Sequence, residues 1–142
     1  MSGVAEMVAW LRREIETDKT KAQAVTQGMA WCTKDVEGDE LWDFSFIAIY
    51  TDGWPWRETA RCCLENEADH IARHDPQDVI ARCDAELAIL DEHEDIDGHC
   101  ETCGNYDPTG LHEHSVAAPC RTVRLLAQGY RHRDGWRGEW AT

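Results

Sequence analysis

The sequence predicts an α+β fold, with three to four helices packed on a small antiparallel β-meander. Three observations predict this class. Apolar residues recur at helical spacing near the N-terminus, a central run over 41–50 alternates between two faces, and two helical runs follow over 57–74 and 76–93. The length of 142 residues suits a single domain, 1–142, with one modest core.

The N-terminal segment, 1–28, is predicted to form one helix over 4–25. Its apolar stripe contains Val4, Met7, Val8, Leu11 and Ile15. These positions share one face of a helix because they are three or four residues apart. No Gly or Pro interrupts the run before Gly28, where the helix is expected to have ended.

The segment 29–57 is predicted to form the β-meander. "MAWCT" is a short β-like run, and "LWDFSFIAIY" alternates as a strand does. The turn sequence "TDG" follows at 51–53. "WPW" at 54–56 is expected to add a third strand, which Pro55 confines to an edge.

The segment 58–93 is predicted to be a pair of helices. Asp75 is a good N-cap residue and Pro76 suits the first helical position, whereas residues before proline leave the helical region. One helix is therefore expected to end near His74. The next begins at Pro76 and ends near His93.

The last segment, 94–142, should contain a loop, a final helix and a tail rich in Trp and Arg. Residues 94–119 show little periodicity, and so long a structureless loop is uncommon in a compact domain. Something should therefore hold this loop in place. Residues 120–130 have helical character, and the tail "RHRDGWRGEW" has two Trp, which predicts that it packs against the domain.

The charge of the chain is strongly acidic and uneven. The formal net charge is −14, and no Lys or Arg occurs between Arg82 and Arg121. A negative field repels nucleic acid. Nucleic-acid binding is therefore only an alternative, and it would use five arginines near the C-terminus: Arg121, Arg124, Arg131, Arg133 and Arg137. With no signal peptide and no run of eighteen apolar residues, we expect a cytoplasmic protein.

Three of the seven cysteines form the strongest chemical pattern. An odd number of cysteines without an export signal argues against a disulfide framework and favours metal binding. Cys100 and Cys103 form a Cys-x-x-Cys pair, and Cys120 follows Pro119 at the start of the last helix. Thiolate sulfur is a favoured ligand of Zn²⁺, which takes four tetrahedral ligands. Such a site would clamp both ends of the 94–119 loop.

The fourth zinc ligand is predicted to be His93, with His114 second and a water molecule third. His93 lies at the end of the preceding helix, whereas His99 adjoins Cys100 too closely to reach the same tetrahedron easily. Four protein ligands would make the site closed and structural; a water ligand would open it to catalysis. A redox role for Cys100 and Cys103 is disfavoured because the pair does not open a helix.

A second pattern is "HIARHDP". His70 and His74 are four apart, so on a helix they share a face and could bind a metal, as in the H-E-x-x-H motif. The Glu of that motif is absent, because Ile71 takes its place. We expect His74 and Asp75 to end one helix and cap the next, and a His70/His74 hydrolase site to be the alternative.

The sequence also resembles a small family of domains of unknown function found in actinobacteria and their phages. The resemblance is carried by the "HIARHDP" box, the Cys-x-x-Cys pair and "PCRTVRLLAQGYRHRDGWRGEW". It covers most of the chain, and it implies the grouping of His93, Cys100, Cys103 and Cys120 without implying an activity. It also touches residues outside that group: His70, His74, Asp75, Pro76, Pro119, Thr122, Leu126, Ala127, Tyr130 and His132.

Together these features predict a small zinc-stabilised, non-enzymatic binding or regulatory protein that acts through a protein partner. No phosphate loop or nucleophile elbow points to an enzyme. Trp and Arg dominate binding hot spots. The partner surface is therefore predicted to include residues of the tail, namely Arg133, Trp136, Arg137 and Trp140. A metal-dependent hydrolase with an open zinc site is the alternative.

Overall fold

The computed structural model describes six stretches of the chain, namely residues 3–25, 31–36, 46–51, 58–62, 65–104 and 115–141. These stretches divide into two compact units. Unit 1 contains 1–17 and 83–142, and unit 2 contains 18–82. The α+β prediction is confirmed, because helices and antiparallel strands are both present. The single domain over 1–142 stays a prediction.

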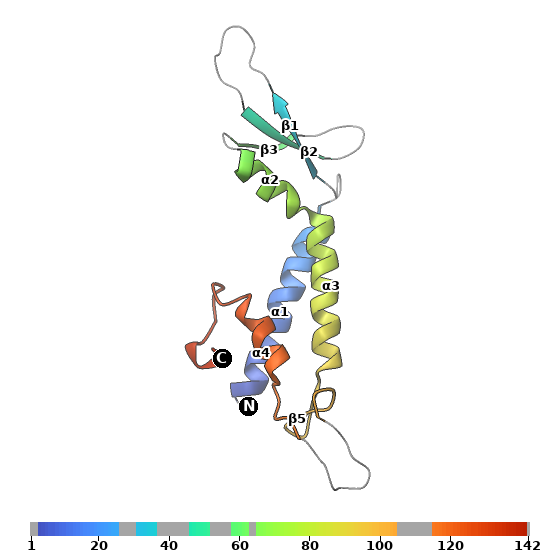
Figure 1. Cartoon of the computed structure of the whole chain (residues 1–142), viewed down its shortest axis with the longest axis vertical. Helices are drawn as coiled ribbons and strands as arrows, with labels where there is room; N and C mark the ends of the chain where they lie inside the picture. Colours follow the sequence, from blue (N-terminus) through green and yellow to red (C-terminus); the bar gives the residue numbers. More distant parts are fainter. Residues whose placement is uncertain are drawn as a thin grey trace. The chain divides into compact units, whose positions relative to one another are not determined.

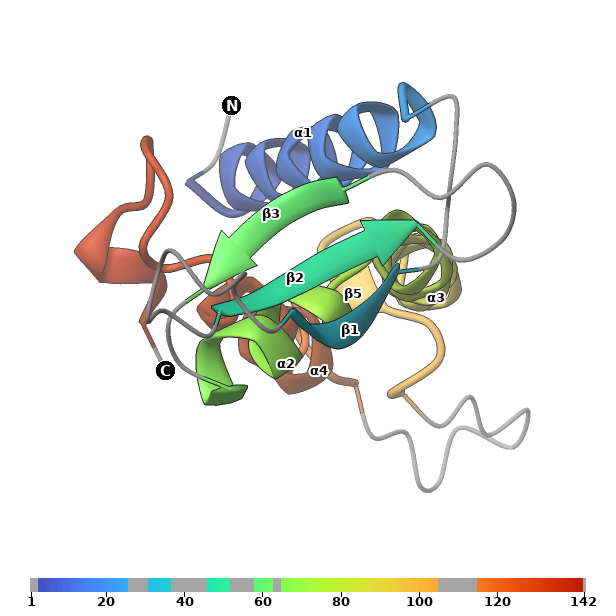
Figure 2. The ribbon, with the colours of Figure 1, turned by 90° about the horizontal axis from the view of Figure 1, so that it is seen from above.

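Unit 2 is built on a three-stranded antiparallel sheet, in which β1 (Trp31–Val36) and β3 (Glu58–Cys62) flank β2 (Phe46–Thr51). Trp31 pairs with Thr51 and Ile47 with Cys62, so the strands form a meander. Helix α2 (Glu65–Arg73) lies against this sheet (Figures 1 and 2). The small side chain of Ala68 on α2 is fully buried.

The third strand is where the sequence-based assignment is wrong in part. Residues 58–62 were predicted to begin a helix, but they form β3 and pair with β2. Backbone pairing along β2 outweighs a weak helical preference, and the β-branched Thr59 suits a strand. The predicted strand at 54–56 lies outside the described residues.

Unit 1 is built around two helices that run side by side (Figure 1). They are α1 (Gly3–Gln23) and α3 (Pro76–Glu92), and their unit 1 parts are joined by an ion pair of 2.7 Å between Arg12 and Asp91. Three residues of the predicted apolar stripe on α1 are fully buried, namely Met7, Leu11 and Ile15. Helix α3 begins at Pro76 as predicted, and the Asp75 carboxylate accepts the backbone N–H of Asp78 as an N-cap.

Two short strands that the sequence analysis did not predict follow α3. They are β4 (Asp95–Ile96) and β5 (His99–Cys100), joined by a two-residue turn. Both turn residues have positive φ, 53° at Asp97 and 85° at Gly98, as a type I′ hairpin requires. The Asp-Gly pair at 97–98 is the sequence signal for this turn.

The C-terminal tail packs into the core of unit 1. Helix α4 (Arg121–Gln128) buries Val123 and Ala127, and the 3₁₀ helix η1 (Gly138–Trp140) follows the tail turn. The ring of Trp10 on α1 contacts two tail tryptophans, with centroids 5.7 Å from Trp136 and 5.3 Å from Trp140. The prediction that the tail packs is confirmed.

A glycine fixes the approach of this tail to α1. Gly135 has a φ of 86°, and a Cβ atom there would lie 2.9 Å from Nε1 of Trp10. That nitrogen donates a hydrogen bond of 3.0 Å to the carbonyl of Asp134. Glycine suits position 135 for two reasons: it adopts a positive φ without strain, and it has no Cβ atom to clash with the Trp10 ring.

We expect Gly135→Ala to lower the free energy of unfolding by about 1–3 kcal/mol, because alanine is strained at this φ and its methyl group displaces Trp10. Urea denaturation followed by circular dichroism measures the change. Gly138→Ala is the matched control, since a Cβ atom at Gly138 meets nothing within 4 Å. Equal stability of the two variants would contradict the prediction.

Candidate metal site

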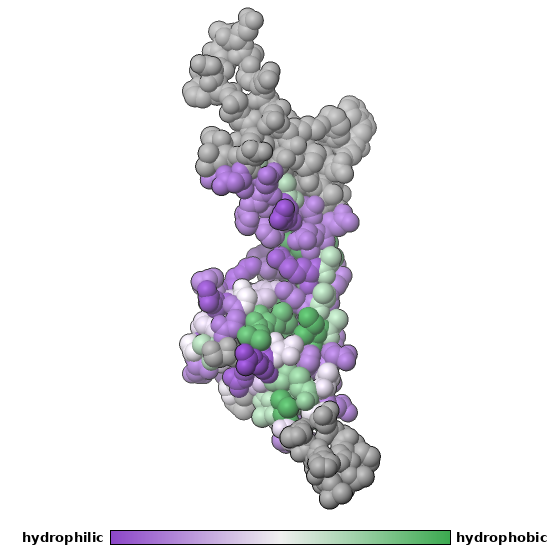
Figure 3. All heavy atoms as spheres, viewed as in Figure 1, coloured by the Kyte–Doolittle hydropathy of each residue, from purple (hydrophilic) through white to green (hydrophobic). Residues whose placement is uncertain are grey.

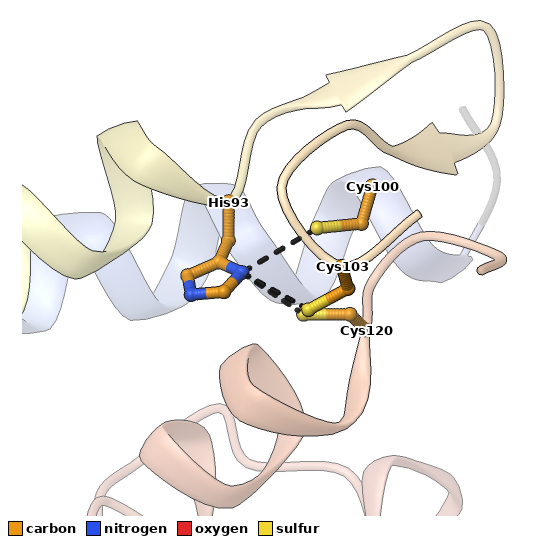
Figure 4. A group of neighbouring side chains, drawn as sticks. All are labelled: His93, Cys100, Cys103 and Cys120. Atoms are coloured by element: carbon orange, nitrogen blue, oxygen red, sulfur yellow. Dashed lines mark hydrogen bonds between the residues drawn. The ribbon is translucent and has the colours of Figure 1, made fainter. Parts of the chain in front are cut away.

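Four predicted ligand residues converge at one end of unit 1, as Figure 4 shows. His93 directly follows α3, and Cys100 ends β5. Cys103 lies in the turn after β5, and Cys120 immediately precedes α4. The site therefore draws on the end of one helix, a hairpin and the start of another helix.

The ligand atoms are spaced as a tetrahedral metal site requires. The Nδ1 atom of His93 lies 3.4, 3.3 and 3.5 Å from the Sγ atoms of Cys100, Cys103 and Cys120, respectively. All four ligand atoms lie within 4.8 Å of one another. Zinc bonds of about 2.3 Å to sulfur and about 2.1 Å to nitrogen place tetrahedral S and N ligands about 3.6 Å apart. The arrangement fits such an ion, with Nδ1 as the histidine donor.

Backbone hydrogen bonds hold the cysteines in place. The N–H of Cys100 donates to the carbonyl of Val116 at 2.8 Å, and the N–H of Ala118 donates to Gly98 at 2.9 Å. Residues 116–118 thus lie along the hairpin, with a bridge between His99 and Ala117. The sequence patterns gave no role to Val116 or Ala118, because their contribution is made by backbone atoms.

The turn between the paired cysteines is closed by two further contacts. The N–H of Gly104 donates to the carbonyl of Cys100 at 3.0 Å. The hydroxyl of Thr102 donates to the carbonyl of Glu92, at the end of α3. The Cys-x-x-Cys turn is therefore tied directly to the helix that precedes His93. The sequence analysis did not single out Thr102, whose only signal is its place between the two cysteines.

The surroundings of Cys120 favour its ionisation. Burial opposes its ionisation, but hydrogen bonds from the Val123 backbone N–H and from the neighbouring thiols outweigh burial and lower the pKa of Cys120. The backbone N–H of Val123 belongs to the first turn of α4, where N–H groups have no partner within the helix.

Cys103 shows why this group of sulfurs suits a cation. Its hydrogen bond to Cys120, together with desolvation and the nearby Cys100, raises the pKa of Cys103 to about 11. Three thiolates this close repel one another, and a bound divalent cation offsets that repulsion. Cys100 and Cys120 are 1% and 2% exposed, whereas Cys103 is only half-buried. Cys103 therefore lies on the open side of the cluster.

One comparison with known proteins finds a match for this chain. A family model described as "Family of unknown function (DUF6221)" matches residues 4–142. The chain belongs to the DUF6221 family. No curated protein and no solved structure matches it.

The other candidate ligands of this DUF6221 chain lie elsewhere. The Nδ1 atom of His99 is 2.6 Å from the hydroxyl of Ser115, and His99 is not among the clustered ligands. His114, the second candidate for the fourth ligand, lies outside the described residues. The cluster of His93 with the three cysteines is the only group of at least three ligand residues found in the described part of the chain.

The four tail residues predicted to bind a partner differ in environment. Trp140 is 5% exposed and lies edge-on to Trp136, with centroids 5.7 Å apart. Arg137 forms an ion pair of 2.7 Å with Glu6 of α1 and lies over the Trp140 ring. Arg133 is exposed. Trp140 and Arg137 thus make contacts within unit 1, and a role of the tail in partner binding stays a prediction.

The alternative sites also have defined positions in this family member. His70 and His74 lie at the end of α2 and are exposed, with ring centroids 4.7 Å apart. Of the C-terminal arginines, Arg124 donates from Nε to the carbonyl of Pro119 at 3.1 Å, and Arg131 donates to His132. None of the described helices is long and apolar enough to cross a membrane.

Proposed function

We propose that this chain binds one Zn²⁺ ion through His93, Cys100, Cys103 and Cys120, and that the ion is structural. One observation carries the proposal: three sulfur atoms lie 3.3–3.5 Å from Nδ1 of His93. Three soft thiolates and one imidazole form a typical structural zinc site, whereas Ca²⁺ and Mg²⁺ prefer oxygen ligands.

The proposed ion would act as a cross-link within unit 1. The four ligands come from the end of α3, the β4–β5 hairpin and the start of α4. A metal ion bound there would join these elements and hold both ends of the 94–119 segment. Binding energy of this kind contributes directly to folding.

We propose further that the protein is a non-enzymatic binding protein that acts through a protein partner. Four protein ligands leave a tetrahedral zinc no open position for a catalytic water. Leu125 on α4 is 51% exposed, and Ile96 of β4 is also exposed. Apolar residues are visible on the face of unit 1 that carries α4 (Figure 3). Apolar surface of this kind suits a protein partner.

The closed character of the site can be tested with Co²⁺ in place of zinc. We expect one Co²⁺ per chain, with the strong visible absorption of a tetrahedral thiolate complex, and no spectral change when cyanide is added. His93→Ala is the comparison variant, because it replaces the imidazole with an exchangeable ligand and should make the spectrum respond to cyanide.

A cyanide response in the unmodified chain would overturn the structural assignment. It would indicate an open coordination position and would favour the metal-dependent hydrolase. No metal uptake at all would reject the zinc site itself.

The partner and the biological setting are separate parts of the proposal. An origin in actinobacteria or their phages, with action in the cytoplasm, is proposed from the resemblance of the sequence. Genome neighbourhood tests the origin and supplies candidate partners for co-purification. Leu125→Glu should weaken capture of a true partner while leaving folding intact, because this side chain is half-exposed.

A further inference from the structure

We propose that His70 and His74 form a second metal site at the C-terminal end of α2, which binds an exchangeable divalent transition-metal ion. The site is separate from the cysteine cluster, because both histidines belong to unit 2 whereas the four clustered ligands belong to unit 1. The inference therefore goes beyond the proposed function and does not depend on it.

The two imidazole rings already have the spacing of a chelate. Their centroids are 4.7 Å apart, with an angle of 71° between the ring planes. Metal–nitrogen bonds of about 2.1 Å place two imidazoles bound to one tetrahedral ion with centroids about 5 Å apart. Residues four apart project from the same face of a helix, one turn from each other. Rotation of these two exposed side chains would direct both rings at one ion.

The carboxylate of Asp78 adds negative charge beside His74. Oδ2 of Asp78 lies 3.9 Å from Nδ1 of His74. The position of Asp78 is fixed by the helix junction, where its backbone N–H donates to the Asp75 carboxylate at 2.8 Å. Negative charge at this distance attracts a cation toward the ring of His74. Asp78 is therefore placed to support His74 as a ligand.

The donors and their exposure define the class of ion. Imidazole nitrogen with a nearby carboxylate suits Ni²⁺, Cu²⁺ and Zn²⁺ and does not favour Ca²⁺ or Mg²⁺. The His74 and Asp78 side chains are about half-exposed, so water would fill the remaining coordination positions. Two protein ligands at a hydrated surface hold an ion more weakly than four ligands in the buried cysteine cluster. The ion at this site should therefore exchange readily.

The experiment is a titration of the zinc-loaded full chain with Ni²⁺ alone, followed by calorimetry and by metal counting after dialysis. We expect one Ni²⁺ per chain in addition to the resident zinc. His70→Ala and His74→Ala should each remove this binding, and Asp78→Asn should weaken it about tenfold. His132→Ala is the matched control, because it deletes an exposed imidazole elsewhere in the chain and should leave Ni²⁺ binding unchanged.

Zinc counting separates this proposal from the cysteine site. One zinc per chain should remain in both histidine variants, and circular dichroism should be unchanged because the replaced rings are exposed. The second site is rejected if the unmodified chain takes up no Ni²⁺ beyond its zinc, or if binding persists in His74→Ala. In that case the two rings simply pack against each other. Loss of zinc with retention of Ni²⁺ binding in Cys100→Ser would support the second site alone.

Discussion

Cys100→Ser is expected to abolish zinc binding at the cysteine cluster and the cooperative unfolding of unit 1. The Cys100 side chain is 1% exposed, and its sulfur lies 3.4 Å from Nδ1 of His93, so serine removes a ligand at the centre of the cluster. Structural zinc contributes about 10–16 kcal/mol in zinc-finger peptides. Whole domains are stable by only about 5–15 kcal/mol. The contribution of the ion is therefore comparable to the whole stability margin of a domain.

Three measurements check this expectation. Metal analysis should fall from one zinc per chain to none, and the sharp thermal transition followed by circular dichroism should broaden or disappear. A chelator should have the same effect on the unmodified chain, and added zinc should reverse it. Cys83→Ala is the matched control, because Cys83 is equally buried but lies outside the cluster. It should keep its zinc and lose about 1 kcal/mol of stability.

A Cys100→Ser chain that keeps the original melting transition without metal would reject the structural role of the ion. Retention of zinc by that variant would have a different meaning. It would show that Cys100 is dispensable as a ligand, and the ligand set would need to be reassigned.

The cluster could be predicted from the sequence because the spacing of its cysteines along the chain is typical of one shared metal ion. Cys100 and Cys103 can share an ion through a single turn, and a cysteine at the start of a helix is prepared for ionisation. His93 was favoured because it lies at the end of the predicted helix that begins at Pro76. In the structure this helix ends at Glu92, one residue before His93. These are local signals, and local signals are what a single sequence displays best.

The parts that escaped prediction depend on contacts between distant residues. Residues 58–62 have weak local preferences, and their strand state is decided by pairing with β2. The hairpin that carries Cys100 was missed for a related reason. Its strands are two residues long and show no alternation, and they are held by the backbone of residues 116–118, which are far away in the sequence. The only sequence signal for this hairpin was the Asp97–Gly98 pair, which favours a two-residue turn.

Trp10→Ala should be the most destabilising substitution away from the metal cluster. The Trp10 ring is 5% exposed and contacts the rings of Trp136 and Trp140 at once. Removing a buried tryptophan costs about 3–5 kcal/mol, because apolar burial is lost and a cavity remains. Detachment of the tail from α1 should accompany this loss. Urea denaturation measures the stability, and limited proteolysis within 131–141 reports the release of the tail.

Trp10→Phe separates the ring contacts from the hydrogen bond. Phenylalanine keeps an aromatic ring against the two tail tryptophans but loses the bond of 3.0 Å from Nε1 to the Asp134 carbonyl. Its cost should be smaller than that of alanine, and the hydrogen-bond part should be about 1 kcal/mol. If both variants are equally destabilised, the hydrogen bond and not the ring packing would be the main contact.

A double-mutant cycle with Gly135→Ala would show that Trp10 and the tail turn act together. In the unmodified chain an alanine at 135 is both strained at a φ of 86° and in conflict with the Trp10 ring. In a Trp10→Ala background the conflict disappears and only the backbone strain remains. The two losses should therefore sum to more than the loss of the double variant. Simple additivity would mean that the tail turn is positioned independently of Trp10.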